Sequence, residues 1–118
     1  MNSISPQLQN QISQFQQVQQ QLQAVNAQKI QMESQKREME RTVEELSKAE
    51  GDVYKSVGSL LIKTEDKEGL RSELEESLET LEIRIRSMDR QEKALREKYE
   101  SLQETINRAL GQSGSEED

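Results

Sequence analysis

The stretch Val53–Lys63 reads Val-Tyr-Lys-Ser-Val-Gly-Ser-Leu-Leu-Ile-Lys, and the two halves of the chain are arranged about it. Two runs rich in β-forming residues, Val53–Val57 and Leu60–Thr64, flank a two-residue loop of Gly58 and Ser59. Gly at the first loop position readily adopts the φ > 0 that a type II′ turn requires. The stretch therefore predicts a β-hairpin in which the numbers of paired residues sum to 117.

A heptad repeat of apolar residues leads up to this hairpin. Ser5 followed by Pro6 is typical of a helix start, because Ser caps the first turn and Pro fits the first helical position. A sustained 3.5-residue repeat favours a coiled coil, and we expect Gly51 to end this helix as a left-handed cap. Ile12 widens the apolar stripe near the start, and the expected seam positions are Leu8, Gln11, Phe15, Val18, Leu22, Val25, Lys29, Met32, Lys36, Met39, Val43 and Leu46.

A second heptad repeat follows the hairpin. Either Thr64 or Asp66 can cap its first turn, and the sequence does not choose between them. Gly69 predicts a soft first turn, because Gly costs about 1 kcal/mol relative to Ala in a helix. We expect Gly111 to end the helix, whose seam positions are Lys67, Arg71, Leu74, Leu78, Leu81, Ile85, Met88, Glu92, Leu95, Tyr99, Leu102, Ile106 and Ala109.

The two repeats predict an antiparallel pair of helices. Heptad spacing alone allows facing seam residues to sum to 110, 117 or 124, but only 117 agrees with the hairpin. In that register Lys29 and Glu92 lie in adjacent layers of opposite helices, which predicts an ion pair that fixes the register. The fold is thus expected to be mainly α, a long antiparallel two-helix coiled coil with one central β-hairpin. Its expected parts are an N-terminal helix at 1–50, the hairpin at 51–65, a C-terminal helix at 66–110 and a disordered acidic tail at 111–118.

Composition narrows the possible functions. Only 31% of residues are hydrophobic and 33% are charged, which favours a narrow apolar seam over a wide core. A net charge of −7 argues against a nucleic-acid partner, and no apolar run is long enough for a membrane span. The sequence has no Cys, no His and no Gly-rich phosphate loop, so we expect no catalytic site, cofactor or metal site. Without a recognisable signal peptide or Cys, we expect a cytoplasmic protein.

Two surfaces are candidates for binding. The hairpin carries apolar side chains on both faces, so it either folds onto its own helices or joins hairpins of other chains, and we favour assembly. Residues 1–28 contain no charged side chain, and 13 of residues 1–35 are Gln. This segment is either an ordinary solvated helix face or a contact surface that is cheap to desolvate, and composition alone leaves both interpretations open.

Three short motifs resemble those of the prefoldin family. They are the hairpin stretch Val53–Lys63, Leu81-Glu82 with Arg84, and Arg90-Gln91-Glu92. The resemblance covers about residues 5–110, and the single central hairpin matches the beta class, in its archaeal form, because subunits of the alpha class have two. Eukaryotic subunits of the beta type share this plan.

The resemblance implies a hexamer of two α and four β subunits, in which the hairpins join an oligomeric β-barrel platform. It also implies an ATP-independent chaperone, a holdase that captures non-native proteins at coiled-coil tips and delivers them to a group II chaperonin. Carried onto this chain, client contacts fall on Leu8, Ile12, Phe15, Leu102, Ile106, Ala109 and Leu110. Assembly contacts fall on Val53, Tyr54, Val57, Leu60, Leu61 and Ile62. The alternative is a structural coiled-coil adaptor, which would bind one defined folded partner instead of many unfolded chains.

Overall fold

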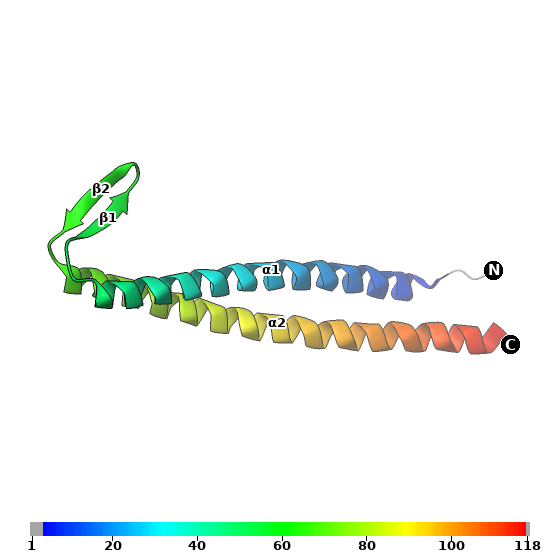
Figure 1. Cartoon of the computed structure of the whole chain (residues 1–118). Coiled ribbons are helices and arrows are strands. Elements are labelled where there is room, and N and C mark those ends of the chain that lie inside the picture. The colour runs from blue at the N-terminus through cyan, green and yellow to red at the C-terminus, as the bar shows by residue number, and fades with distance from the viewer. Residues whose placement is uncertain (1–3, 118) are drawn as a thin grey trace. The chain divides into compact units, whose positions relative to one another are not determined.

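The chain forms two long helices joined through a β-hairpin (Figure 1). The computed structural model describes the backbone of residues 4–117 and the side chains of residues 4–111. Helix α1 spans Pro6–Lys48, strands β1 and β2 span Val53–Val57 and Leu60–Thr64, and helix α2 spans Lys67–Glu117. The expected mainly α fold with one hairpin is confirmed, and no helix among the described residues is long and apolar enough to cross a membrane.

The helices contribute to two compact units. The terminal unit comprises Met1–Lys29 and Met88–Asp118, and the hairpin unit comprises Ile30–Ser87. The described segments of α1 and α2 within each unit lie side by side (Figure 1). Each unit therefore contains its own stretch of the helix pair, and the hairpin belongs entirely to the second unit.

Burial follows the predicted heptads in both units. Every predicted seam position from Leu8 to Ala109 is buried or half-buried, whereas most other helical positions are exposed. Among the described residues, the buried apolar side chains are Leu8, Val18 and Val25 in the terminal unit, and Leu46, Leu81 and Ile85 in the hairpin unit. The core is therefore a narrow apolar seam, which is why a chain with so few hydrophobic residues can still pack its helices.

Side-chain caps begin both helices. The backbone N–H of Leu8 donates to Oγ of Ser5 at 3.1 Å, which confirms the predicted start of α1. At the start of α2 the N–H of Gly69 donates to Oδ1 of Asp66 at 2.8 Å. Of the two candidate caps for α2, Asp66 is therefore the one that the fold uses.

Gly69 is explained by this same cap. An ideal Cβ atom placed on Gly69 would lie 2.2 Å from Oδ2 and 2.7 Å from Cγ of Asp66. Any larger residue would push the short Asp66 side chain away from the N–H of residue 69 that it caps. The glycine at position 69 leaves room for the cap, so its low helix propensity is offset by this contact.

Both predicted glycine stops are wrong. Helix α1 ends at Lys48, and among the described residues only Gly58 has a positive φ, so Gly51 is not a left-handed cap. Instead the ammonium group of Lys67 donates to the carbonyl oxygen of Ala49, just beyond the end of α1. Helix α2 continues past Gly111 to Glu117, because one Gly costs a helix only about 1 kcal/mol. Residues 111–117 of the predicted tail are thus the end of α2, and Asp118 lies outside the described residues.

The hairpin has the predicted register. Val53 pairs with Thr64, Lys55 with Ile62, and Val57 with Leu60, all in antiparallel orientation. The φ of Gly58 is 60°, and no other described residue has a positive φ, as expected when only the first loop position of a type II′ turn needs one. Local sequence chemistry therefore sets the pairing of the two strands.

Candidate functional site

The hairpin exposes its apolar side chains. Tyr54, Val57, Leu60, Leu61 and Ile62 are 56%, 48%, 64%, 74% and 49% exposed, and only Val53 is half-buried. The described part of the chain contains a single sheet of two strands, so each strand has one unpaired edge. An isolated two-stranded hairpin is marginally stable in water, and open edges accept further strands. All six predicted assembly residues lie on this element, and five of them are open to contact.

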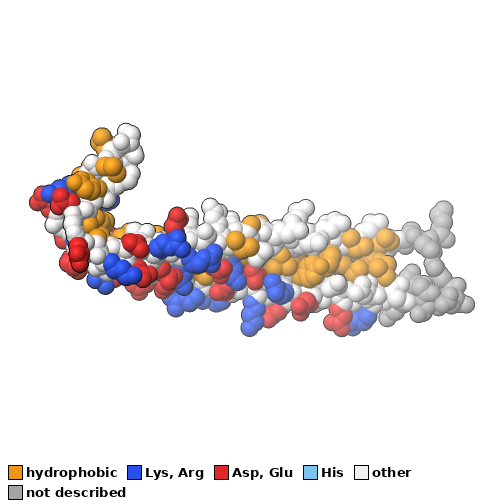
Figure 2. Space-filling view, in the orientation of Figure 1, with side chains coloured by type: hydrophobic (Ala, Val, Ile, Leu, Met, Phe, Trp, Pro, Cys, Tyr) orange, Lys and Arg blue, Asp and Glu red, His pale blue; other side chains and the backbone are white. Residues whose placement is uncertain are grey.

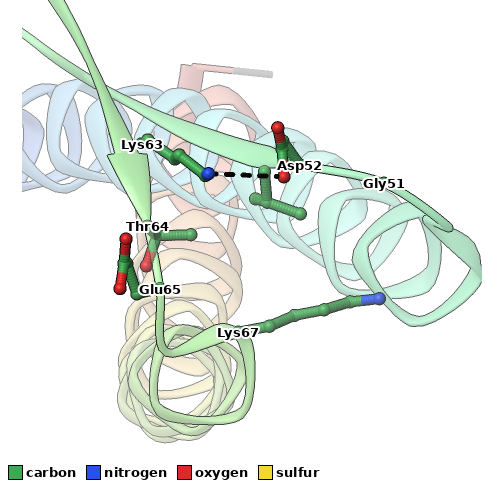
Figure 3. Close-up of a pocket in the computed structure, with 7 residues that line it drawn as sticks. Gly51, Asp52, Lys63, Thr64, Glu65 and Lys67 are labelled. Atoms are coloured by element: carbon green, nitrogen blue, oxygen red, sulfur yellow. Dashed lines mark ion pairs between the residues drawn. The ribbon is translucent and has the colours of Figure 1, made fainter.

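Ion pairs link the hairpin to its surroundings in the hairpin unit. Nζ of Lys63 lies 3.6 Å from Oδ1 of Asp52, and Nζ of Lys55 lies 3.8 Å from Oε2 of Glu73 on α2. The first pair borders an open recess of about 380 Å³ lined by Gly51, Asp52, Val53, Lys63, Thr64, Glu65 and Lys67 (Figure 3). The recess is lined by two acidic residues, Asp52 and Glu65, and two basic residues, Lys63 and Lys67. The Lys67 side chain reaches toward the end of α1 (Figure 3). Among the described residues no His, Cys, Asp or Glu cluster could hold a metal ion.

The terminal unit holds all seven predicted client-contact residues. Leu8 is buried, Leu110 is 48% exposed, and the others (Ile12, Phe15, Leu102, Ile106 and Ala109) are half-buried. Figure 2 shows apolar side chains gathered along the seam between the two helices of this unit. The apolar surface is therefore only partly used by the helix pair itself.

Two residues of the terminal unit were missed as candidates. The ring of Phe15 stacks on Tyr99, with centroids 4.6 Å apart and planes inclined by 27°. Tyr99 was recognised as a seam position but not as a partner of Phe15, although the two fall in neighbouring layers of the predicted register. Ile4 is 42% exposed and precedes the helix start, but it lies seven residues before the seam position Gln11, so extending the heptad by one repeat would have identified it.

A charged layer interrupts the seam of the terminal unit. Nζ of Lys29 lies 2.7 Å from Oδ1 of Asp89 and 3.7 Å from Oε1 of Glu92, which confirms the predicted cross-helix pair. Arg96 also approaches Oε1 of Glu92, at 3.4 Å. Sequence reasoning missed Asp89, although its place one turn before Glu92 puts it on the same side of α2.

Comparison with known proteins gives a consistent result. Residues 9–113 match the family model described as "Prefoldin subunit". The chain is 46% identical over 112 residues to "Prefoldin subunit beta" of Methanosarcina mazei, covering 93% of this chain and 95% of that protein. It is 54% identical over 110 residues to "Prefoldin subunit beta" of Methanococcus vannielii, covering 92% and 96%.

The fold matches a solved structure as well. The crystal structure of the prefoldin beta subunit from Thermococcus strain KS-1 superposes with a TM-score of 0.83 at 39% sequence identity. The match covers 93% of this chain and 97% of that chain. Both helices and the hairpin are therefore included in the similarity.

Proposed function

Because the chain belongs to the prefoldin family, as a chaperone subunit of the beta class, we propose that it acts as an ATP-independent holdase. In this proposal two α and four β subunits form a hexamer, and their hairpins build a shared β-barrel platform. The coiled coils capture non-native proteins and deliver them to a group II chaperonin, in the cytoplasm. The observation that carries the proposal is that the chain has two exposed apolar surfaces, one on the hairpin and one in the terminal unit.

The hairpin supports the assembly step. Leu60 and Ile62 lie on the same face of the hairpin, at 64% and 49% exposure, and a free chain leaves this apolar area in water. Fully burying a side chain of this kind is worth about 1.5–3 kcal/mol. Several hairpins meeting at such faces would gain this energy and also pair their open strand edges.

A charge substitution on the hairpin tests the assembly step. Replacing Leu60 and Ile62 with Asp should split the complex in native mass spectrometry, while helical circular dichroism stays largely unchanged. Ser59→Asp is the matched control, because it adds a charge at the loop without removing apolar area, and it should leave the complex whole. An intact complex with both Asp substitutions would contradict the platform.

The terminal unit supports the holding step. Its apolar stripe is wider than a two-helix seam needs, since Ile12 is only half-buried and Leu110 is 48% exposed. These side chains can bury further area against an unfolded chain. Several subunits gripping one client would multiply such weak contacts through effective concentration.

Truncation and a point substitution test the holding step. Deleting residues 1–14 together with 103–118 should preserve the hexamer and abolish its suppression of client aggregation. Leu110→Ser should weaken suppression, whereas Ile83→Ser should not, because Ile83 is similarly exposed (53%) but belongs to the hairpin unit. Equal protection by the truncated and full-length complexes would place the holding surface elsewhere. Binding to one folded partner, with none to unfolded chains, would favour the adaptor.

A further inference from the structure

The outer surface of α1 changes character along its length. Residues 1–28 contain no charged side chain, and the charges begin with Lys29. Within the hairpin unit, residues 30–87 carry fifteen acidic and ten basic side chains. Along the facing part of α2 in the terminal unit, residues 88–111 carry five acidic and five basic side chains. The terminal unit therefore contributes almost nothing to the net negative charge up to Gly111, and the only charged side chain in its α1 half is Lys29.

Helix formation does not require this neutrality. Glu, Lys and Arg have helix propensities equal to that of Gln, and the same helix uses them freely beyond Lys29. All glutamines from Gln7 to Gln28 are exposed except Gln11, so the seam does not need them either. The uncharged surface is thus an additional property that the fold leaves unexplained.

The glutamines form an ordered stripe beside the seam. Gln7, Gln14, Gln21 and Gln28 repeat every seven residues, and each directly precedes a seam residue: Leu8, Phe15, Leu22 and Lys29. Gln35 continues the repeat in the hairpin unit. In ordinary coiled coils this position carries charges that select one partner helix by interhelical ion pairs. Here all four positions carry neutral, exposed amides. Figure 2 shows the uncharged side chains of α1 next to the apolar seam of the terminal unit.

Amide side chains suit an extended polypeptide. A Gln amide offers an acceptor oxygen and two donor hydrogens, the same groups that an unpaired peptide backbone needs. It costs less to desolvate than a charged group, and it neither attracts nor repels a charged client. Successive glutamines of the stripe lie about 10.5 Å apart along the helix, so each can contact an extended client at a separate point.

We propose that the stripe of Gln7, Gln14, Gln21 and Gln28 is a charge-indifferent docking surface for extended polypeptide. Its amides hydrogen-bond the backbone of a client whose apolar side chains contact the neighbouring seam. This inference rests on the proposed holdase function and specifies the clients: unfolded segments of either net charge. Affinity at this surface depends on apolar content and a free backbone, and only weakly on ionic strength.

The experiment uses the assembled complex and two permanently unfolded peptides of equal apolar content, one rich in Lys and the other rich in Glu. Binding is measured by fluorescence anisotropy at low and high salt. The wild-type complex should bind both peptides within about twofold of each other at either salt concentration, since its stripe has no charge to screen. A tenfold preference for one peptide in the wild type would overturn the inference.

Two variants separate charge from hydrogen bonding. Gln→Glu at all four stripe positions should favour the Lys-rich peptide by about tenfold at low salt, with the preference lost at high salt. Gln→Ala at the same positions should weaken the binding of both peptides about equally, by about tenfold, because the hydrogen bonds from the amides are lost. Circular dichroism should show unchanged helicity in both variants.

Placing Glu at Gln9, Gln16, Gln20 and Gln23 provides the matched control, since these exposed glutamines lie off the stripe. This control variant adds the same charge, and its preference for the Lys-rich peptide should be clearly smaller than that of the Gln→Glu stripe variant. If both stripe variants bind the two peptides as the wild type does, the glutamine surface is not the docking site, although holdase function stands. If the wild type binds neither peptide and protects no client, the proposed function itself fails.

Discussion

Oε1 of Glu92 lies 3.7 Å from Nζ of Lys29, across the seam between α1 and α2 of the terminal unit. The two side chains are 15% and 23% exposed, so both are largely withdrawn from water. In the register that sums to 110, Lys29 would face Leu81 and lie far from Glu92. In the register that sums to 124, Lys29 would face Leu95 and remain one layer from Glu92, but it would move away from Asp89. The Lys29–Glu92 pair therefore disfavours the register that sums to 110, and the contact of Lys29 with Asp89 disfavours the register that sums to 124.

The register can be tested with engineered disulfides. Leu22→Cys combined with Leu95→Cys should close readily without loss of helicity, because the two positions face each other in the observed register. Leu22→Cys combined with Met88→Cys is displaced by one heptad and should close poorly. Oxidation followed by non-reducing electrophoresis measures both, and the reverse pattern would contradict the register.

The charged layer should show energetic coupling. Lys29→Met leaves Glu92 largely buried without its cross-helix cation, and we expect a loss of about 1–2 kcal/mol in the free energy of unfolding, after allowing for solvent screening and for Arg96. Adding Glu92→Leu should recover most of that loss, since two apolar residues fill the same layer. Urea denaturation followed by circular dichroism measures the free energy of unfolding of the wild type, the two single variants and the double variant. Strictly additive effects would show that the two residues do not interact.

Asp66 and Gly69 should also be coupled. Asp66→Ala removes the cap of α2 and should cost about 1 kcal/mol. Gly69→Ala alone should bring little or no gain, because its Cβ displaces the Asp66 carboxylate. In the Asp66→Ala background the same substitution should stabilise the protein by up to about 1 kcal/mol, since only helix propensity then remains. A full gain from Gly69→Ala in both backgrounds would mean that the carboxylate simply moves aside.

Substitution of Gly58 should destabilise the hairpin. Its φ of 60° is unfavourable for a residue with a Cβ, so Gly58→Ala should cost about 1–2 kcal/mol and weaken assembly. Gly51→Ala is the matched control, because Gly51 has no positive φ and an added Cβ meets nothing within 4 Å. The two substitutions are compared by the melting temperatures of their complexes. Equal melting temperatures for Gly58→Ala and Gly51→Ala would show that the turn tolerates a side chain.

Much of this fold could be predicted from the sequence because its rules are local. The pairing of Val53 with Thr64 follows from a two-residue loop that begins with Gly, and one loop determines every other pair of the hairpin. The buried positions of both helices follow from a 3.5-residue repeat that the chain keeps for many turns. With the hairpin register and heptad spacing combined, the Lys29–Glu92 pair was predictable before any contact was observed.

The tertiary structure decided two kinds of feature. One is the choice between residues that are equally suited to cap or end a helix, and the other is a contact between side chains that are far apart in the sequence. Thr64 and Asp66 are both good caps by residue type, and only the backbone path shows that the N–H groups of α2 meet Asp66. Gly51 and Gly111 both match a helix stop, yet Lys67 satisfies a carbonyl beyond α1, and α2 absorbs the small cost of Gly111. The stacking of Phe15 on Tyr99 and the contact of Lys29 with Asp89 were likewise decided by the tertiary structure, because side-chain rotamers on two helices set those distances.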